Sequence, residues 1–172
     1  MYKMYIKFFD VLSLQSLKHD SGVISLSLDS TTNILIKKRL DIISLDELIV
    51  DIKYKKKNKT TLNTRYELNI VGKQKCVVTL KALDFKIEKK FNMNFININK
   101  SDLKKLDDEY LEPIINNQVN LGEVALQMIS LFLDPYPKSK SFNNIIENYN
   151  NKEEKHSINN NNMFELLNNL KK

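Results

Sequence analysis

Apolar and polar side chains alternate along three segments of this 172-residue chain, and this alternation limits the fold more than any other feature. In the clearest segment, residues 85–95, large apolar side chains hold the odd positions other than Lys89. Lysine, glutamate and asparagine hold the even positions. Residues 47–54 and 66–70 show the same pattern. Because successive side chains of a strand point to opposite faces, the pattern predicts strands with one apolar and one wet face.

Connections and caps extend this prediction. The polar stretch Lys55–Thr60 reads as a turn between strands. Good N-cap residues at 29–31 predict a helix over about Thr32–Leu40. Asn120 is placed to cap a second helix, Leu121–Phe132, which the prolines after it end. We therefore expect an α+β fold. An antiparallel sheet, either a meander or a partly closed barrel, is packed by one main amphipathic helix and one or two short helices.

Composition divides the chain into three parts. Residues 1–137 carry the periodic segments and have the length of a single domain with its own core. Residues 138–162 are rich in asparagine and are predicted to be a mostly disordered linker. Residues 163–172 hold Phe164, Leu167 and Leu170 at helical spacing and predict a short C-terminal helical segment. This segment is suited to docking either on the domain or on a partner.

Cysteine content and hydropathy indicate the compartment. One cysteine cannot form an internal disulfide, which favours a reducing, cytoplasmic setting. No apolar run is long enough for a transmembrane helix, and the first ten residues do not resemble a secretory signal. We expect a cytoplasmic protein without a membrane partner.

The net charge of +6 is unevenly distributed. Residues 51–90 hold 12 Lys or Arg and 4 Asp or Glu, whereas residues 101–123 hold 2 basic and 6 acidic residues. If the strands pair as a meander, the basic side chains gather along one edge. There they either bind phosphates or protect an exposed strand edge from pairing with other chains. Tyr54 and Tyr66 are candidates for stacking on unpaired bases. The candidate nucleic-acid-binding residues are Lys53, Lys55, Lys56, Lys57, Lys59, Arg65, Lys73, Lys75 and Lys81.

No catalytic constellation is visible. His19 and His156 are far apart in the sequence and read as solvated surface residues. Cys76 has no Cys or His at metal-ligand spacing and reads as a buried, inert thiol on a strand with Val78 and Leu80. The acidic run Asp107–Glu109 is more typical of a solvated surface than of a magnesium site. We predict no enzyme activity, no catalytic residue, no metal and no cofactor.

Several short blocks occur in a recognisable order. Gln74–Leu80 contains the cysteine, Val119–Glu123 enters the second helix, and Leu133–Pro137 ends it. Met163–Leu170 closes the chain. Together they resemble the YceD family of large ribosomal RNA subunit accumulation proteins, most closely its alphaproteobacterial branch. The matched positions are Gln74, Cys76, Leu80, Leu121, Gly122, Glu123, Asp134, Pro135 and Pro137.

This resemblance implies a role in ribosome biogenesis. Family members are linked to the accumulation, processing or stability of 23S ribosomal RNA. The implied partners are ribosomal RNA or a 50S precursor, with a ribosomal protein or ribonuclease as a further partner. Many relatives carry a second cysteine where this chain has Thr79, so a metal site suggested for them does not carry over. The alternative is a protein-interaction module acting through Leu121–Phe132 and the C-terminal segment.

Overall fold

The computed structural model describes residues 2–58, 61–97, 111–114 and 116–139. The candidate residue Lys59, the acidic run Asp107–Glu109 and His156 lie outside these residues. So do nearly all of the predicted linker and the whole predicted C-terminal segment, 163–172.

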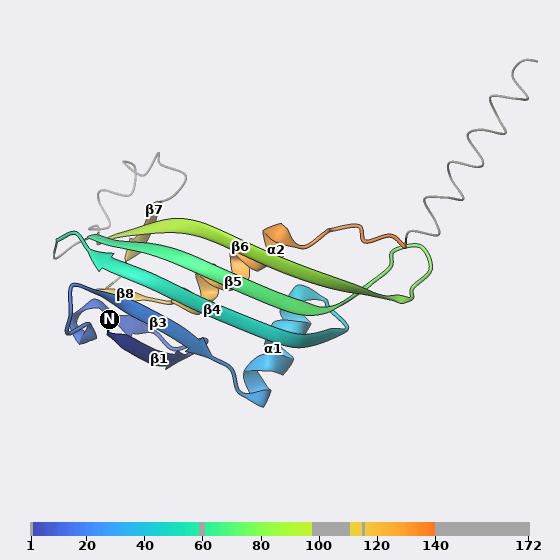
Figure 1. Cartoon of the computed structure of the whole chain (residues 1–172), viewed down its shortest axis with the longest axis horizontal. Coiled ribbons are helices and arrows are strands. Elements are labelled where there is room, and N and C mark those ends of the chain that lie inside the picture. Colours follow the sequence, from blue (N-terminus) through green and yellow to red (C-terminus); the bar gives the residue numbers. More distant parts are fainter. Residues whose placement is uncertain (1, 59–60, 98–110, 115, 140–172) are drawn as a thin grey trace, which may run out of the picture.

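Six strands form one sheet in the order β1-β3-β4-β5-β6-β7 (Figure 1). A second sheet pairs two short strands, β2 and β8. The strands of the large sheet are β1 (Lys3–Lys7), β3 (Ser21–Ser27), β4 (Ser44–Lys56), β5 (Thr61–Lys75), β6 (Ala82–Asn97) and β7 (Leu111–Ile114). Those of the small sheet are β2 (Leu12–Ser13) and β8 (Gln118–Val119), and a 3₁₀ turn, η1 (Leu14–Ser16), follows β2.

The large sheet is mixed, which corrects the prediction of a purely antiparallel sheet. Strands β3, β4, β5 and β6 pair antiparallel, as expected for a meander. However, β1 runs parallel to β3, and β7 runs parallel to β6. A parallel pair needs a crossover of about a dozen residues or more. Residues 8–20 and 98–110 supply connections of that length. The predicted α+β class is confirmed, and β1 and β7 form the two edges of the sheet.

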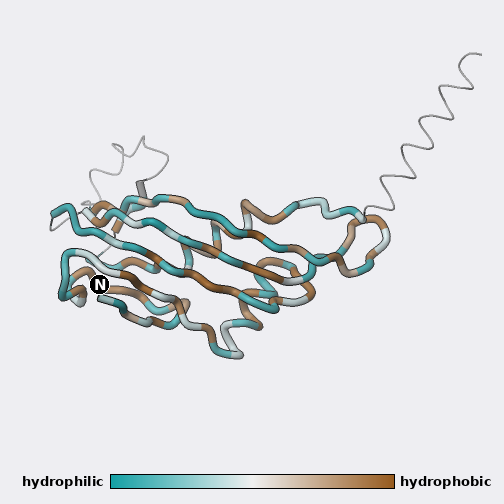
Figure 2. The backbone as a smooth tube through the Cα atoms, in the orientation of Figure 1, coloured by the Kyte–Doolittle hydropathy of each residue, from teal (hydrophilic) through white to brown (hydrophobic). Residues whose placement is uncertain are grey.

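The central strands bury alternate side chains, as their sequence pattern predicts. In β4, Leu48, Val50, Ile52 and Tyr54 are buried, while the residues between them face water or the margin of the core. Apolar and polar positions therefore alternate along the strands in Figure 2. One face of the sheet forms the core, and the other face stays wet.

Helix α1 (Ser30–Leu40) begins close to its predicted start. The Asp29 carboxylate accepts a hydrogen bond from the Thr32 backbone N–H at 2.7 Å, which caps the helix. This bond also lowers the pKa of Asp29. Only Thr32 and Ile36 of α1 are buried, so this helix contributes little to the core.

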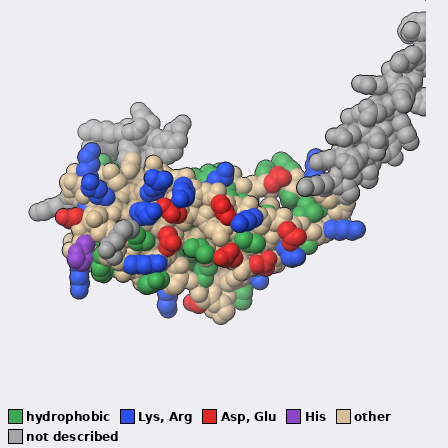
Figure 3. Space-filling view, viewed as in Figure 1, with side chains coloured by type: hydrophobic (Ala, Val, Ile, Leu, Met, Phe, Trp, Pro, Cys, Tyr) green, Lys and Arg blue, Asp and Glu red, His purple; other side chains and the backbone are tan. Residues whose placement is uncertain are grey.

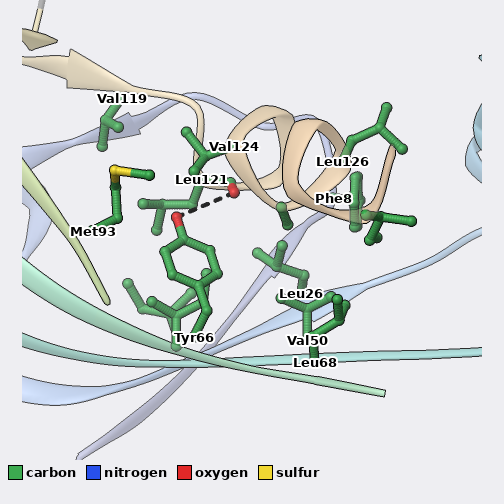
Figure 4. Close-up of a cluster of buried hydrophobic side chains, with 14 of the residues drawn as sticks. Phe8, Leu26, Val50, Tyr66, Leu68, Met93, Val119, Leu121, Val124 and Leu126 are labelled. Carbon is green, nitrogen blue, oxygen red and sulfur yellow. Dashed lines mark hydrogen bonds between the residues drawn. The ribbon is translucent and has the colours of Figure 1, made fainter. Parts of the chain in front are cut away.

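Helix α2 (Leu121–Phe132) has the predicted bounds and lies on the apolar face of the sheet (Figure 4). The Asn120 side chain accepts a hydrogen bond from the Glu123 backbone N–H at 2.9 Å. The Tyr66 hydroxyl donates to the Leu121 carbonyl oxygen at 3.3 Å, which joins the helix to the centre of the sheet. Among the described residues, neither α-helix is long and apolar enough to cross a membrane.

Gly122 allows the start of α2 to touch the backbone after β1. A Cβ atom at Gly122 would lie 1.7 Å from the Phe8 carbonyl oxygen and 2.7 Å from its carbonyl carbon. Backbone atoms cannot rotate away as a flexible side chain can. Close packing therefore explains the glycine at this position.

We predict that Gly122→Ala destabilises the fold by about 3 kcal/mol, because the helix must move off the Phe8 backbone. Urea denaturation followed by circular dichroism measures this free energy. The exposed Ser130 on the same helix provides the control. Ser130→Ala should change stability by less than about 0.5 kcal/mol. Equal effects of the two substitutions would contradict the close-packing account.

Candidate functional site

Residues 76–80 form the turn between β5 and β6, which corrects the prediction of a strand. The Cys76 N–H donates to the Lys81 carbonyl at 2.8 Å, and the Leu80 N–H donates to the Cys76 carbonyl at 3.0 Å. Leu80 has a φ of 59°, which breaks the extended conformation. Val78 and Leu80 are exposed as a result, whereas Cys76 is buried as predicted.

The turn lies directly against the segment that follows α2. The Val77 N–H donates to the Pro137 carbonyl oxygen at 3.0 Å. The Gln74 carboxamide donates to the Asp134 carbonyl oxygen at 3.1 Å. The cysteine block and the proline block, which are far apart in the sequence, are therefore in contact in the fold.

Glu123, in the block that begins α2, also contacts another helix. Both carboxylate oxygens of Glu123 accept hydrogen bonds from the Arg39 guanidinium, at 2.6 and 2.7 Å. These bonds lower the pKa of Glu123 and raise that of Arg39. In a capping box the side chain of Glu123 would reach back to its own N-cap, but here it joins α1 to α2. Gln74 and Glu123, two positions of the sequence blocks, therefore join elements of the fold.

The Cys76 thiol is surrounded by hydrogen-bond donors. The Thr79 N–H lies 3.4 Å from the Cys76 Sγ atom. Hydrogen bonds from the Thr79 hydroxyl and backbone N–H, with contributions from the Val78 and Ser139 backbone, lower the thiol pKa to about 6. Burial of the thiol opposes this shift. Sequence reasoning predicted the burial but missed the donors, because they depend on the turn.

The candidate basic residues do not gather along one edge, which corrects that prediction. Strands β4 and β5 are interior strands. Arg65 and Lys75 stand at opposite ends of β5, about 33 Å apart at the usual rise per residue. Lys73, Lys75 and Lys81 lie near the turn that holds Cys76, and Lys73 forms an ion pair with Asp84 at 3.1 Å.

Lys56 and Lys57 lie at the end of the sheet opposite the turn that holds Cys76, but their side chains have different surroundings. The Lys56 ammonium donates a hydrogen bond to the Leu17 carbonyl oxygen. Lys57 follows β4 and is exposed. Both line a hollow of about 700 Å³, which Asp20 and Asn117 also line. Lys56 is therefore directed to the side of η1, and not to the wet face.

Pairing register assembles a basic group on the wet face of the sheet. Lys53 lies opposite Arg65 on β5 and opposite Val23 on β3. Val23 in turn lies opposite Lys3 on β1, so three cationic side chains share one row across the strands. Lys55 stands one row further toward the β4–β5 connection. We call Lys3, Lys53, Lys55 and Arg65 the basic end. In Figure 3 cations are frequent on this side of the wet face, at the left.

Sequence reasoning missed Lys3, because its place depends on the parallel pairing of β1 with β3. The next row holds two carboxylates, Asp51 and Glu67, which partly neutralise this group. Glu67 forms ion pairs with Lys53 at 2.6 Å and Lys90 at 3.7 Å, and the Lys53 bond lowers the Glu67 pKa. Lys55 and Arg65 form no ion pair among the residues that the structure describes.

Tyr54 and Tyr66 cannot act as the predicted stacking platforms. Their exposed fractions are 3% and 0%, because both side chains point into the core. The Tyr66 ring stacks on Phe91 at a centroid distance of 4.7 Å, and burial raises the Tyr66 pKa above its ordinary range. The alternation that marked these tyrosines as strand residues also placed them on the apolar face.

Within the described ranges, no three His, Cys, Asp or Glu residues are grouped so that they could hold a metal ion. His19, which the sequence placed at the surface, is exposed and lies against Tyr2 with ring centroids 4.6 Å apart. No protein-family model, curated protein or solved structure matches this chain.

We predict that the Cys76 thiol titrates near pH 6 in the folded protein. The ultraviolet absorbance of the thiolate, measured as the difference from a Cys76→Ser variant, follows this titration. Because the folded pKa lies below the ordinary value of about 8.5, the thiolate stabilises the fold above that pH. This stabilisation is lost as the pH falls through 6.

Thr79→Val should raise the midpoint toward the ordinary value, since it removes the hydroxyl donor. Thr79→Ser retains the hydroxyl and should keep the midpoint near 6. A midpoint near 8.5 in the unmodified protein would show that the turn does not stabilise the thiolate.

Proposed function

We propose that the protein is a non-enzymatic ribosome-biogenesis factor of the YceD type. It supports the synthesis, processing or stability of 23S ribosomal RNA and contacts that RNA through the basic end. The observation that carries the proposal is the row of cations across the strands. Lys53 and Arg65 stand on the neighbouring strands β4 and β5, Lys3 stands beyond Val23 on β1, and Lys55 stands in the next row. Such side chains neutralise phosphates without reading bases.

Contacts among the motif blocks support the family part of the proposal. Gln74 and Val77 of the cysteine block bond to Asp134 and Pro137 of the proline block. If these blocks resembled the family only by chance, direct contact between them would not be expected. Because Gln74, Gly122 and Glu123 are engaged in the scaffold, these matched positions are not available to bind RNA, whereas the wet face is.

A protein-interaction module is the second candidate. The apolar face of α2 does not favour it in the predicted form, since Leu121, Val124, Ala125, Leu126 and Ile129 are buried. A different observation does favour it. Val77, Val78 and Leu80 in the turn and Tyr136 beyond α2 have exposed fractions of 43% to 70%. They offer an apolar surface at the end opposite the basic end.

A salt titration of binding to 23S ribosomal RNA fragments tests the proposal. The slope of log affinity against log salt should become smaller by about 2 to 3 units in a Lys53→Gln, Lys55→Gln, Arg65→Gln variant, since three phosphate contacts are lost. The matched control is Lys73→Gln, Lys75→Gln, Lys81→Gln, which removes the same charge from the other end of the sheet. It should leave the slope nearly unchanged.

Equal effects of the two triple variants would mean that only net charge matters, and the basic end would lose its assignment. Affinity that is insensitive to salt and to both variants would favour the protein-interaction module.

A further inference from the structure

A shallow depression lies on the wet face within the basic end. Its volume is about 390 Å³. Its lining includes the cations Lys53, Lys55 and Arg65 and the carboxamides Asn63, Asn92 and Asn94. Tyr54 and Thr64 also line it, but both are buried. Sequence reasoning had selected the cations but had assigned nothing to the asparagines.

Register arranges these six side chains as a grid of two rows on three strands. One row is Lys53, Arg65 and Asn92, and the next is Lys55, Asn63 and Asn94. The usual spacings of strands and residues give the grid dimensions of about 10 by 7 Å. Cations stand on the β4 side, carboxamides stand on the β6 side, and β5 contributes one of each. A phosphate can thus contact β4 while its neighbouring sugar contacts β6.

The three carboxamides make no side-chain hydrogen bond to any part of the chain that the structure describes. Each therefore offers two N–H donors and a carbonyl acceptor to a ligand. The ribose 2′-hydroxyl is both a donor and an acceptor, and it is the group that distinguishes RNA from DNA.

Among the described residues that line the depression, no aromatic ring is accessible. Tyr54 lines it but is only 3% exposed, and its ring belongs to the core. Single-stranded nucleic acid is usually held by bases stacked on exposed aromatic side chains. Duplex RNA is instead recognised through its phosphates and 2′-hydroxyls, which are the groups that cations and carboxamides bind.

We infer that this depression binds the sugar–phosphate backbone of duplex RNA. Lys53, Lys55 and Arg65 contact phosphates, and Asn63, Asn92 and Asn94 hydrogen-bond to 2′-hydroxyls. The inference rests on the proposed function and specifies its ligand as helical ribosomal RNA rather than unpaired segments.

The test compares three probes with the full chain in one buffer of fixed salt. They are an RNA duplex of about 16 base pairs, the DNA duplex of the same sequence, and one RNA strand alone. Fluorescence anisotropy gives each affinity. Two to three hydrogen bonds to 2′-hydroxyls should make the RNA duplex about tenfold tighter than the DNA duplex. The single strand should also bind more weakly than the RNA duplex.

The variant Asn63→Ala, Asn92→Ala, Asn94→Ala should remove the preference for RNA over DNA without changing the salt slope. Asn69→Ala alters a carboxamide on the same face outside the depression and should retain the preference. Circular dichroism verifies that the variants fold. If the triple variant does not fold, each single substitution should still remove part of the preference.

The possible results separate the inference from the proposed function. Equal affinity for RNA and DNA duplexes, or a preference unaffected by the asparagine substitutions, would overturn the role of the carboxamides. Tightest binding to the single strand would overturn the duplex assignment while RNA contact itself stands. Failure to bind any of the probes or a 23S fragment would remove the proposed RNA contact as well.

Discussion

Burial of alternate side chains on one face of β4, β5 and β6 is the constraint on which the structure depends. The residues Val50, Ile52 and Tyr66 are almost fully removed from water, and Val50 and Tyr66 lie beneath α2 (Figure 4). A slip of one residue in any of these strands would place lysines in the core, so the register is strongly fixed. That same register brings Lys53 opposite Arg65 on the wet face. The strand register therefore determines both the core and the basic end.

The two faces of the sheet have different roles. The apolar face receives α2, whose start fits because Gly122 has no side chain near Phe8. The Arg39–Glu123 ion pair is partly exposed and stabilises the fold only modestly, but its two bonds fix α1 relative to α2. Gly122 and Glu123, which belong to one of the sequence blocks, therefore stabilise the fold. The wet face is therefore the surface that we propose for RNA binding.

Local signals in the sequence were sufficient for much of the fold. Period-two alternation located β6, and the Asn120 cap located α2, because both features act within a few residues. The turn after β5 was missed since it contains no glycine or proline. Its left-handed residue is Leu80, held by hydrogen bonds that the sequence does not reveal. The place of Lys3 in the same row as Lys53 depends on strands distant in the sequence, and so does the parallel pairing at both edges.

The central claim is that the basic end of the sheet contacts ribosomal RNA in the cell. Ultraviolet crosslinking of the tagged full chain in cells tests it most directly, with the bound RNA sequenced and the crosslinked peptides identified in the same sample. We expect 23S precursor RNA to be attached to peptides that contain residues 53–65 or 92–94. Crosslinks confined to the turn around Cys76, or recovery of partner proteins without ribosomal RNA, would contradict it.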